Sequence, residues 1–343
     1  MSDAELGIFG LPVSEETSKI ILLPVPWEVT TSYGVGASNG PKIINDASFQ
    51  VDLFDLETKN AYQVGYFMRD IPSFMLKKNK IMKAKAQEVA QMLEIGLSSN
   101  VDNKRVSKLQ TEINSACEEM TEWVYTQSKE ILNSGKFLGL IGGDHSTPLG
   151  AIRALSEKLK GDFGILHIDA HADLRCAYQG FNQSHASIMY NVMTSDFKPK
   201  KLVQVGIRDF CEEEFDFIKH HPQNIKTFFD LDNKRRMMKG TLWSQIVDEI
   251  IQALPQNVYI SFDIDGLEPN LCPNTGTPVA GGLTFDQAFY LFSAIAESKR
   301  KIIGFDLNEV SSGENQNSEW DGNVGARMLF KLCGWAVVTN HLN

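Results

Sequence analysis

The segment Asp169-Ala-His171-Ala-Asp173 carries three side chains that can bind a metal ion, at alternate positions. In an extended chain alternate residues point to the same side, so these three side chains could share one face. Two further segments, Gly142-Gly-Asp-His145-Ser and Asp263-Ile-Asp265, also carry such side chains. Each segment directly follows an apolar run that predicts a buried strand. Three strand ends with carboxylates and imidazoles therefore suggest one metal site assembled from three parts of the chain.

The candidate ligands are two imidazoles and four carboxylates: His145, Asp169, His171, Asp173, Asp263 and Asp265. One zinc ion usually takes four ligands, so this set is large enough for two ions that share carboxylates. Oxygen ligands with some imidazole favour Mn²⁺, with Ni²⁺, Co²⁺ or Fe²⁺ as alternatives. Taken singly, the segments have simpler interpretations, such as a helix-capping turn, a calcium loop or a nucleotide-sugar site. Together they predict a two-ion centre, which could make hydroxide from a shared water at neutral pH.

The elements that must position these residues follow from the hydrophobic pattern. We expect strands at 20–25, 64–67, 137–141, 163–168, 202–207, 258–262 and 302–307, and helices at 40–47, 149–159, 245–254 and 285–297. Apolar strands that alternate with helices predict an α/β fold, with three α/β/α layers around a mostly parallel sheet of roughly eight strands. Such sheets bind ligands beyond the carboxyl ends of their strands, where the three acidic segments fall.

Residues 76–135 differ from the rest, because they are rich in Lys, Glu and Gln and mostly helical in pattern. We expect one helical hairpin, hinged near Ser98-Ser99-Asn100, as an elaboration of a single domain that spans residues 1–343. A core-facing helix is favoured over a partner-binding one, since six residues fall on one helical face: Ile113, Ala116, Cys117, Met120, Val124 and Ile131.

Bulk properties exclude several classes of function. The net charge of −10 and the absence of a long basic run argue against nucleic-acid binding. No apolar stretch reaches the roughly 18 residues that predict a membrane span, and the opening residues MSDAELGIFG lack the pattern of a secretory signal. Five cysteines without a C-x-x-C pair predict reduced thiols. We therefore expect a cytoplasmic protein.

The motifs taken together resemble the arginase/agmatinase (ureohydrolase) family. The resemblance lies in GGDHS at 142–146, DAHADLR at 169–175, SHAS at 184–187, SFDIDGLEPNLCPNTGTPVAGGLT at 261–284 and GFDLNEV at 304–310, and more loosely in TSYGVGASNGPKIINDAS near the N-terminus. It covers nearly the whole chain except the helical stretch at 76–135. It implies an arginase-like fold, and the motifs are closest to those of the agmatinase branch.

The resemblance also implies roles for individual residues. One ion would be held by His145, Asp169, Asp173 and Asp263, and the other by Asp169, His171, Asp263 and Asp265, so that Asp169 and Asp263 bridge both. His185 matches the family's mobile proton-transfer histidine, which would work with Asp173. Glu309 matches the acid that pairs with the substrate's guanidinium. The implied reaction converts a cationic guanidino substrate, agmatine first, into urea and an amine (here putrescine), in a homo-oligomer that is a trimer or a hexamer.

Several alternatives stay open. Arg175 and Ser184 are candidate substrate contacts, although Arg175 could instead pair with a nearby acid. Other possible substrates are arginine, guanidinobutyrate, guanidine and formiminoglutamate. A metal-free regulatory homologue and a single-zinc deacylase are the alternatives from other classes. We expect His167 to lie in the core or behind a ligand, and Asp144 to serve a turn.

Overall fold

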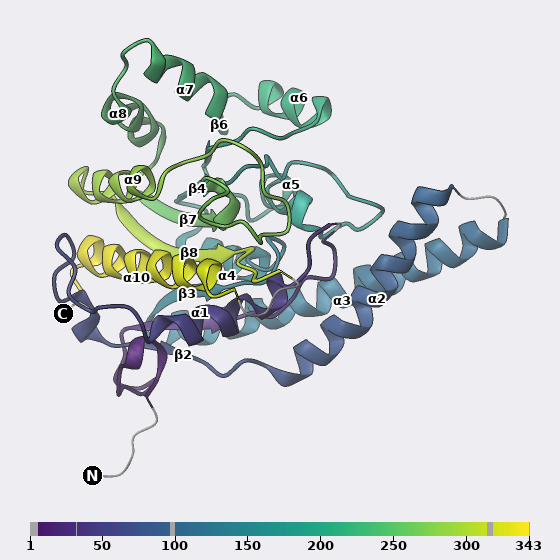
Figure 1. Cartoon of the computed structure of the whole chain (residues 1–343), viewed down its shortest axis with the longest axis horizontal. Helices are drawn as coiled ribbons and strands as arrows, with labels where there is room; N and C mark the ends of the chain where they lie inside the picture. The colour runs from purple at the N-terminus through teal and green to yellow at the C-terminus, as the bar shows by residue number, and fades with distance from the viewer. Residues whose placement is uncertain (1–5, 32, 97–99, 314–317, 343) are drawn as a thin grey trace.

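The computed structural model describes residues 6–31, 33–96, 100–313 and 318–342, and within them eight strands form one parallel sheet (Figure 1). The strands are β1 Ile20–Pro24, β2 Tyr66–Met68, β3 Phe137–Ile141, β4 Gly164–Ile168, β5 Lys201–Val205, β6 Ile225–Phe228, β7 Asn257–Asp263 and β8 Lys301–Asn308. Their order across the sheet is β2-β1-β3-β8-β7-β4-β5-β6, and every neighbouring pair is parallel. The predicted fold class is confirmed.

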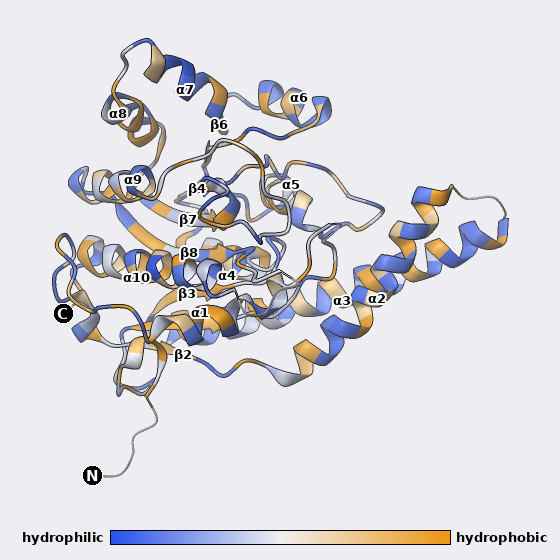
Figure 2. Cartoon of the chain, viewed as in Figure 1, coloured by the Kyte–Doolittle hydropathy of each residue, from blue (hydrophilic) through white to orange (hydrophobic). Residues whose placement is uncertain are grey.

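Both faces of the sheet are buried, which explains why the strands read as continuous apolar runs. In β1, Ile20 and Leu22 belong to the core on one face, whereas Ile21 and Leu23 belong to the core on the other. Figure 2 shows the central strands as largely hydrophobic ribbons among helices that carry both hydrophobic and hydrophilic residues.

Helices cover each face of the sheet. One core is completed by α1 Gly40–Ser48, α8 Trp243–Ala253, α9 Phe285–Glu297 and α10 Trp320–Asn340. The other is completed by α2 Ser73–Ile95, α3 Asn100–Asn133, α4 Leu149–Leu159, α5 Ile188–Thr194 and α6 Glu212–His220. A further helix, α7 Asp230–Met238, follows β6. Among the described residues, no helix is both long and apolar enough to cross a membrane.

Helices α2 and α3 form the expected helical hairpin, and their far ends project from the body of the molecule (Figure 1). The six residues predicted to face the core are all buried. An ion pair of 2.6 Å between Lys85 and Glu112 joins the two helices. The predicted hinge at Ser98 and Ser99 lies outside the described residues, and α3 begins at Asn100.

The four central strands, β3, β8, β7 and β4, are the ones that lead into the acidic segments. Strands β8 and β7 lie between two groups of three strands, β2-β1-β3 on one side and β4-β5-β6 on the other. Because parallel strands end at the same edge, this order gathers segments that are up to about 165 residues apart in sequence, from residue 144 to residue 309.

Candidate metal centre

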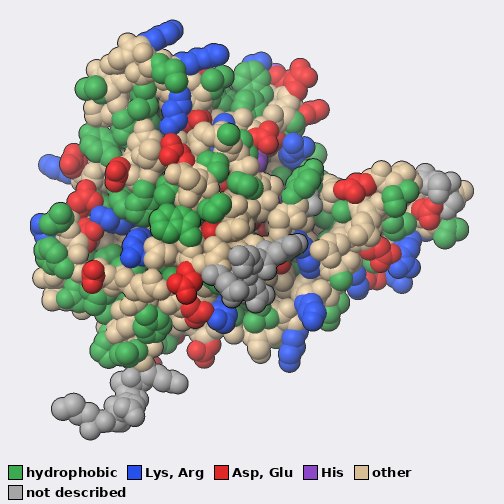
Figure 3. Space-filling model, viewed as in Figure 1, with side chains coloured by type: hydrophobic (Ala, Val, Ile, Leu, Met, Phe, Trp, Pro, Cys, Tyr) green, Lys and Arg blue, Asp and Glu red, His purple; other side chains and the backbone are tan. Residues whose placement is uncertain are grey.

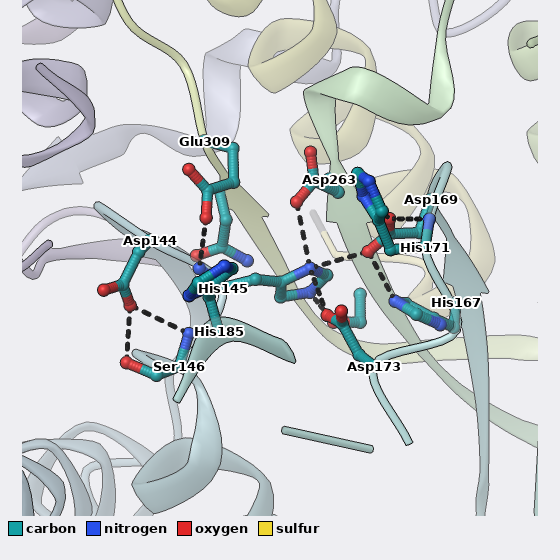
Figure 4. A network of polar contacts seen from close by, with 12 residues as sticks. Asp144, His145, Ser146, His167, Asp169, His171, Asp173, His185, Asp263 and Glu309 are labelled. Atoms are coloured by element: carbon teal, nitrogen blue, oxygen red, sulfur yellow. Dashed lines mark hydrogen bonds and ion pairs between the residues drawn. The ribbon is translucent and has the colours of Figure 1, made fainter. Parts of the chain in front are cut away.

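The predicted metal ligands and Glu309 meet just beyond the carboxyl ends of the four central strands (Figure 4). Two glycines allow the β3 loop to approach its neighbours. A Cβ on Gly143 would lie 1.9 Å from the carbonyl oxygen of Trp27, and a Cβ on Gly142 would lie 1.9 Å from Oδ1 of Asn308. The backbone of Gly143 also accepts a hydrogen bond of 2.7 Å from the Glu309 amide. The loops after β1, β3 and β8 are therefore packed tightly against one another.

His145 points one ring nitrogen at three carboxylates. Its Nδ1 lies 2.9 Å from Oδ2 of Asp169, 3.2 Å from Oδ2 of Asp263 and 3.5 Å from Oδ2 of Asp173. All four side chains are buried. One nitrogen and three carboxylate oxygens that converge in this way can hold a metal ion.

The other ring nitrogen of His145 contacts a serine hydroxyl on the side away from the carboxylates. Its Nε2 lies 2.8 Å from Oγ of Ser261, and that hydroxyl lies 3.0 Å from Oδ1 of Asp306. Both partners are buried. Partners of this kind fix the ring orientation of a histidine that binds metal. The sequence analysis missed Ser261 and Asp306, although each stands two or three residues before a predicted site residue on the same strand or its end.

A second donor group surrounds His171. Its Nδ1 lies 3.1 Å from Oδ2 of Asp265 and 3.5 Å from Oδ1 of Asp169. The two oxygens of Asp169 therefore face different histidines, Oδ2 toward His145 and Oδ1 toward His171. The two possible metal-binding groups overlap at Asp169, as two ions that share a carboxylate would require.

His167 lies within reach of the first donor group, with Nε2 2.8 Å from Oδ2 of Asp169. Its Nδ1 lies 3.1 Å from Nε2 of Gln204, and this amide nitrogen also donates to the carbonyl of Ala172. With the Gln204 amide assigned in this orientation, Nδ1 of His167 accepts and Nε2 carries the proton. A protonated Nε2 can donate to Asp169 but cannot bind metal, which supports the expectation that His167 lies behind a ligand.

Burial and crowded negative charge shift the pKa values of the site. Burial, and then the charges of Asp265 and Asp169, raise the pKa of Asp263 well above its usual range. Burial and the charge of Asp169 do the same to the pKa of Asp173. Burial alone would lower the pKa of His171, but the carboxylates of Asp265 and Asp169 outweigh it and raise this pKa to about 12. Cations relieve such repulsion, so the donor set fits divalent metal ions.

Two site residues adopt backbone angles that are uncommon outside glycine. The φ angle is +54° at Asp173 and +62° at Glu309. The surrounding structure holds both in place, because the carbonyl of Asp173 accepts two amide hydrogen bonds and that of Glu309 accepts one from the Thr275 hydroxyl. Strain of this kind is characteristic of functional sites.

Glu309 has one carboxylate oxygen engaged and one without a partner. Oε1 accepts a hydrogen bond of 3.0 Å from the His145 amide (Figure 4). Oε2 is buried and has no hydrogen-bond partner among the described residues. The nearby Gly276 leaves room beside it, since a Cβ there would lie 3.6 Å from Oε2. Burial raises the pKa of Glu309 well above its usual range, so a cationic group at Oε2 would satisfy the carboxylate.

His185 lies beside the loop that follows β1. Its backbone amide donates to Oγ1 of Thr30 over 3.2 Å, and its Nδ1 lies 3.5 Å from the same oxygen. Burial and the charges of His171 and Lys83 lower the pKa of His185 to about 3, so the ring is neutral at pH 7. The rings of Tyr178 and His185 lie edge to face, with centroids 6.0 Å apart.

An open cavity of about 240 Å³ leads to this centre. It is lined by Tyr33, His171, Asp173, Arg175, Tyr178, His185, Ala186, Asp209, Phe210, Glu214 and Thr277. Arg175 Nε lies 3.5 Å from Oε2 of the buried Glu214, which agrees with the alternative that it pairs with a nearby acid. Ser184 is absent from the cavity wall, because it is buried and its hydroxyl lies 2.9 Å from that of Ser187.

Asp209 was not predicted as a site residue. Its side chain is 68% exposed, and Oδ2 lies 3.9 Å from Nε2 of His171. It stands four residues beyond the end of β5. The position of an acid just past a strand end was the signal that could have identified it. With Arg175 paired to Glu214, Asp209 gives the cavity mouth a negative charge.

Fold and donor set together fit a metal-dependent enzyme of the α/β class, and comparisons with known proteins name the family. The profile of the arginase family matches residues 18–334. N(1)-aminopropylagmatine ureohydrolase from Thermus thermophilus is 30% identical over 319 residues, which cover 93% of this chain and 90% of that protein. Agmatinase from Bacillus anthracis is 27% identical over 324 residues, which cover 94% and 93%.

Solved structures agree on the fold. Agmatine ureohydrolase of Thermoplasma volcanium superposes with a TM-score of 0.70 at 21% identity, over 99% of this chain and 94% of that one. Formiminoglutamase of Trypanosoma cruzi gives 0.69 at 18% identity, over 94% and 95%. The chain belongs to the arginase family. This confirms the resemblance seen in the motifs, and with it the predicted class of enzyme, a hydrolase of guanidino C–N bonds.

Proposed function

We propose that this protein hydrolyses agmatine to putrescine and urea with two Mn²⁺ ions. The observation that carries this proposal is the pair of donor groups that overlap at Asp169, next to the unpartnered Oε2 of Glu309. One ion would be held by His145, Asp169, Asp173 and Asp263, and the other by Asp169, His171, Asp263 and Asp265. When bound, such a pair of ions lowers the pKa of a shared water and so supplies the nucleophile.

The chain's own residues orient the substrate and move protons. Glu309 Oε2 would pair with the guanidinium and turn its central carbon toward the ions, because no other partner competes for this oxygen among the described residues. Asp173 and His185 would carry protons to the departing amine. Asp173 faces the donor group and His185 faces the cavity, so together they connect the buried centre with its opening.

The cavity mouth favours a substrate with a cationic tail. Arg175 is paired with Glu214 and is therefore a poor receptor for a free carboxylate, as in arginine or guanidinobutyrate. Asp209 leaves a negative charge near the opening, which suits the amine of agmatine. A second candidate substrate is N(1)-aminopropylagmatine, which also has a cationic tail and gives its name to the relative from Thermus thermophilus.

The test is urea release by protein loaded with Mn²⁺, and separately with Ni²⁺. The panel is agmatine, N(1)-aminopropylagmatine, arginine, guanidinobutyrate, guanidinoacetate and guanidine, with formiminoglutamate followed as formamide. We expect urea from agmatine. This activity should be lost in Asp263→Ala and kept in the control Asp248→Ala, which changes an exposed aspartate on α8.

Asp209→Asn should raise KM for agmatine and leave turnover of guanidine unchanged. Preferred turnover of arginine would overturn the assignment of the tail, and no bound metal would overturn the mechanism.

A further inference from the structure

Polar side chains of the α2–α3 hairpin reach toward loops of the active site. On α2, Asn79 and Lys83 are buried on the face that carries Met75, Ala86 and Val89. Buried amide and ammonium groups are costly unless they are hydrogen-bonded, and apolar residues would complete this face at lower cost. Asn79 and Lys83 therefore point to a task other than packing.

Both side chains bind the loop that follows β1. Oδ1 of Asn79 accepts a hydrogen bond of 2.8 Å from the Glu28 amide. Nζ of Lys83 donates to the carbonyl of Thr31 over 3.0 Å and also to its hydroxyl. These contacts stand on either side of Thr30. Together they fix the backbone of the segment 28–31.

Thr30 connects this segment with the centre. Its Oγ1 accepts a hydrogen bond from the His185 amide, as described above, and donates to Oδ2 of Asp144 over 3.4 Å. A shift of the segment 28–31 would therefore move the point to which His185 is attached.

Helix α3 binds the segment that leads to His185. Nε2 of Gln110 donates to the carbonyl of Gln179 over 2.8 Å. Asn114 donates to the carbonyl of Gly180 over 3.1 Å and accepts from the Asn182 amide over 3.0 Å. The fit is close at Gly180, where φ is +81° and a Cβ would lie 2.1 Å from Nε2 of Gln110.

A fourth contact lies one residue before Ser184. The Thr121 hydroxyl donates to Oε1 of Gln183 over 2.7 Å. Four residues of the segment before Ser184 are thus hydrogen-bonded to side chains of α3: Gln179, Gly180, Asn182 and Gln183. The α2–α3 hairpin therefore binds both segments next to His185: the one that contains Thr30 and the one that ends at Gln183.

We propose that the α2–α3 hairpin is a positioning element of the active site, with Lys83 and Gln110 as positioning residues that hold the segments 28–31 and 178–184 around His185. This inference rests on the role of His185 in the proposed function. It assigns a task to the stretch of chain that the family motifs do not cover.

The experiment compares Lys83→Met and Gln110→Leu with matched changes on the exposed side of α2, Lys80→Met and Gln87→Leu. We expect both test variants to keep the metal content of the unaltered protein. Their kcat for agmatine should fall by roughly 10- to 100-fold, the scale expected for a displaced catalytic group, while KM changes less. Lys83→Arg should restore part of the loss. Hydrogen exchange, read by mass spectrometry, should accelerate in 28–31 and 178–185 only.

Other results would overturn the proposal that the hairpin positions the two segments. Unchanged kcat, or unchanged exchange in both segments, would overturn the proposal, because the hairpin would then serve packing alone. Global acceleration of exchange would also overturn it, in favour of general destabilisation. If Lys83→Met does not fold, Asn79→Leu takes its place. If the unaltered protein releases no urea, the proposed function is wrong, and exchange confined to the two segments still decides whether the hairpin holds them.

Discussion

At the scale of single residues, the site is built from buried acidic groups that stand close together. Crowded carboxylates face His145 and His171, and one oxygen of Glu309 has no partner among the described residues. On the face of the molecule drawn in Figure 3, by contrast, acidic and basic side chains are interspersed. Cations and a cationic substrate would complete the site.

Glu309→Gln should separate substrate binding from metal binding. Glutamine keeps the size of the side chain but removes the charge that pairs with a guanidinium. Loss of one partner of a buried charge pair costs about 2–5 kcal/mol, which corresponds to a fall in kcat/KM of roughly 30-fold to several-thousand-fold. Metal content should stay at two ions per chain. Steady-state kinetics and metal analysis check this, with the exposed Glu319→Gln as the control. Full activity in Glu309→Gln would refute the pairing.

Ser261→Ala should weaken metal binding without touching a ligand. The change removes the hydroxyl that holds Nε2 of His145. Loss of such an orienting partner commonly lowers metal affinity or activity by about 10–100-fold. Titration against a competing chelator would show it, whereas Ser156→Ala, a buried serine on α4, should bind metal normally. Equal affinities in the two variants would count against the role of Ser261.

At the scale of elements, the loop after α1 is tied to α10 by Asp55. Oδ1 of Asp55 accepts hydrogen bonds from the amides of Glu57 and Thr58, and Oδ2 lies 2.6 Å from Nζ of Lys331. Burial alone would raise the pKa of Asp55, but these hydrogen bonds, that of Lys331 first, lower it. The carboxylate therefore stabilises the fold in its ionised form.

Asp55→Asn should lower the free energy of unfolding by about 1–3 kcal/mol at pH 7. Because the folded pKa is lower than the unfolded value of about 3.9, this contribution is present above that pH and is lost as the pH falls through the folded pKa. The difference in the free energy of unfolding between Asp55→Asn and the unaltered protein should thus become smaller below about pH 4. Urea unfolding at several pH values measures it. Asp46 is the control, because its partner Lys42 is exposed on α1. Asp46→Asn should have almost the same free energy of unfolding as the unaltered protein at every pH.

The elements could be predicted from the sequence to the extent that their burial is uniform. The runs at 137–141, 149–159 and 285–297 match β3, α4 and α9 residue for residue. Strand β6 was missed because it lies at the sheet edge, where Lys226 is exposed and breaks the apolar run. Helix α10 was not expected either. It is buried along most of its length, so its sequence lacks the separate polar and apolar faces that identify a surface helix.

Some residues of the candidate site could likewise be predicted from the sequence, and others could not. The metal-binding segments could be found because side-chain type and strand ends both leave traces in sequence. Ser261, Asp306 and Thr30 could not, because their importance depends on which strands are neighbours and how loops pack, and no local pattern encodes that. The contact of Lys83 with Thr31 spans 52 residues of sequence and belongs to the same class.

At the scale of the whole molecule, metal removal should destabilise the fold. Ions that bind only the folded chain stabilise it by about 2.7 kcal/mol for one site at 100 times Kd. Chelation should therefore lower Tm by several degrees, and added Mn²⁺ should restore it. Calorimetry with and without chelator tests this. In Asp263→Ala the response should be much smaller, and a Tm indifferent to metal in the unaltered protein would contradict a structural contribution of the ions.

The order of the strands also determines when, during synthesis, a metal site can exist. Strands β1 to β3 can pair with one another, and so can β4 to β6, but within the described sheet no hydrogen-bonded ladder joins the two groups until β8 and β7 enter between them. A nascent chain that ends before residue 257 would hold His145 on one group and Asp169 on the other, and both inner strands would have an unpaired edge. Loading of the proposed metal centre should thus follow translation of the last quarter of the chain, which begins with β7. Until then, the inner edges of β3 and β4 are open to pairing with a wrong strand.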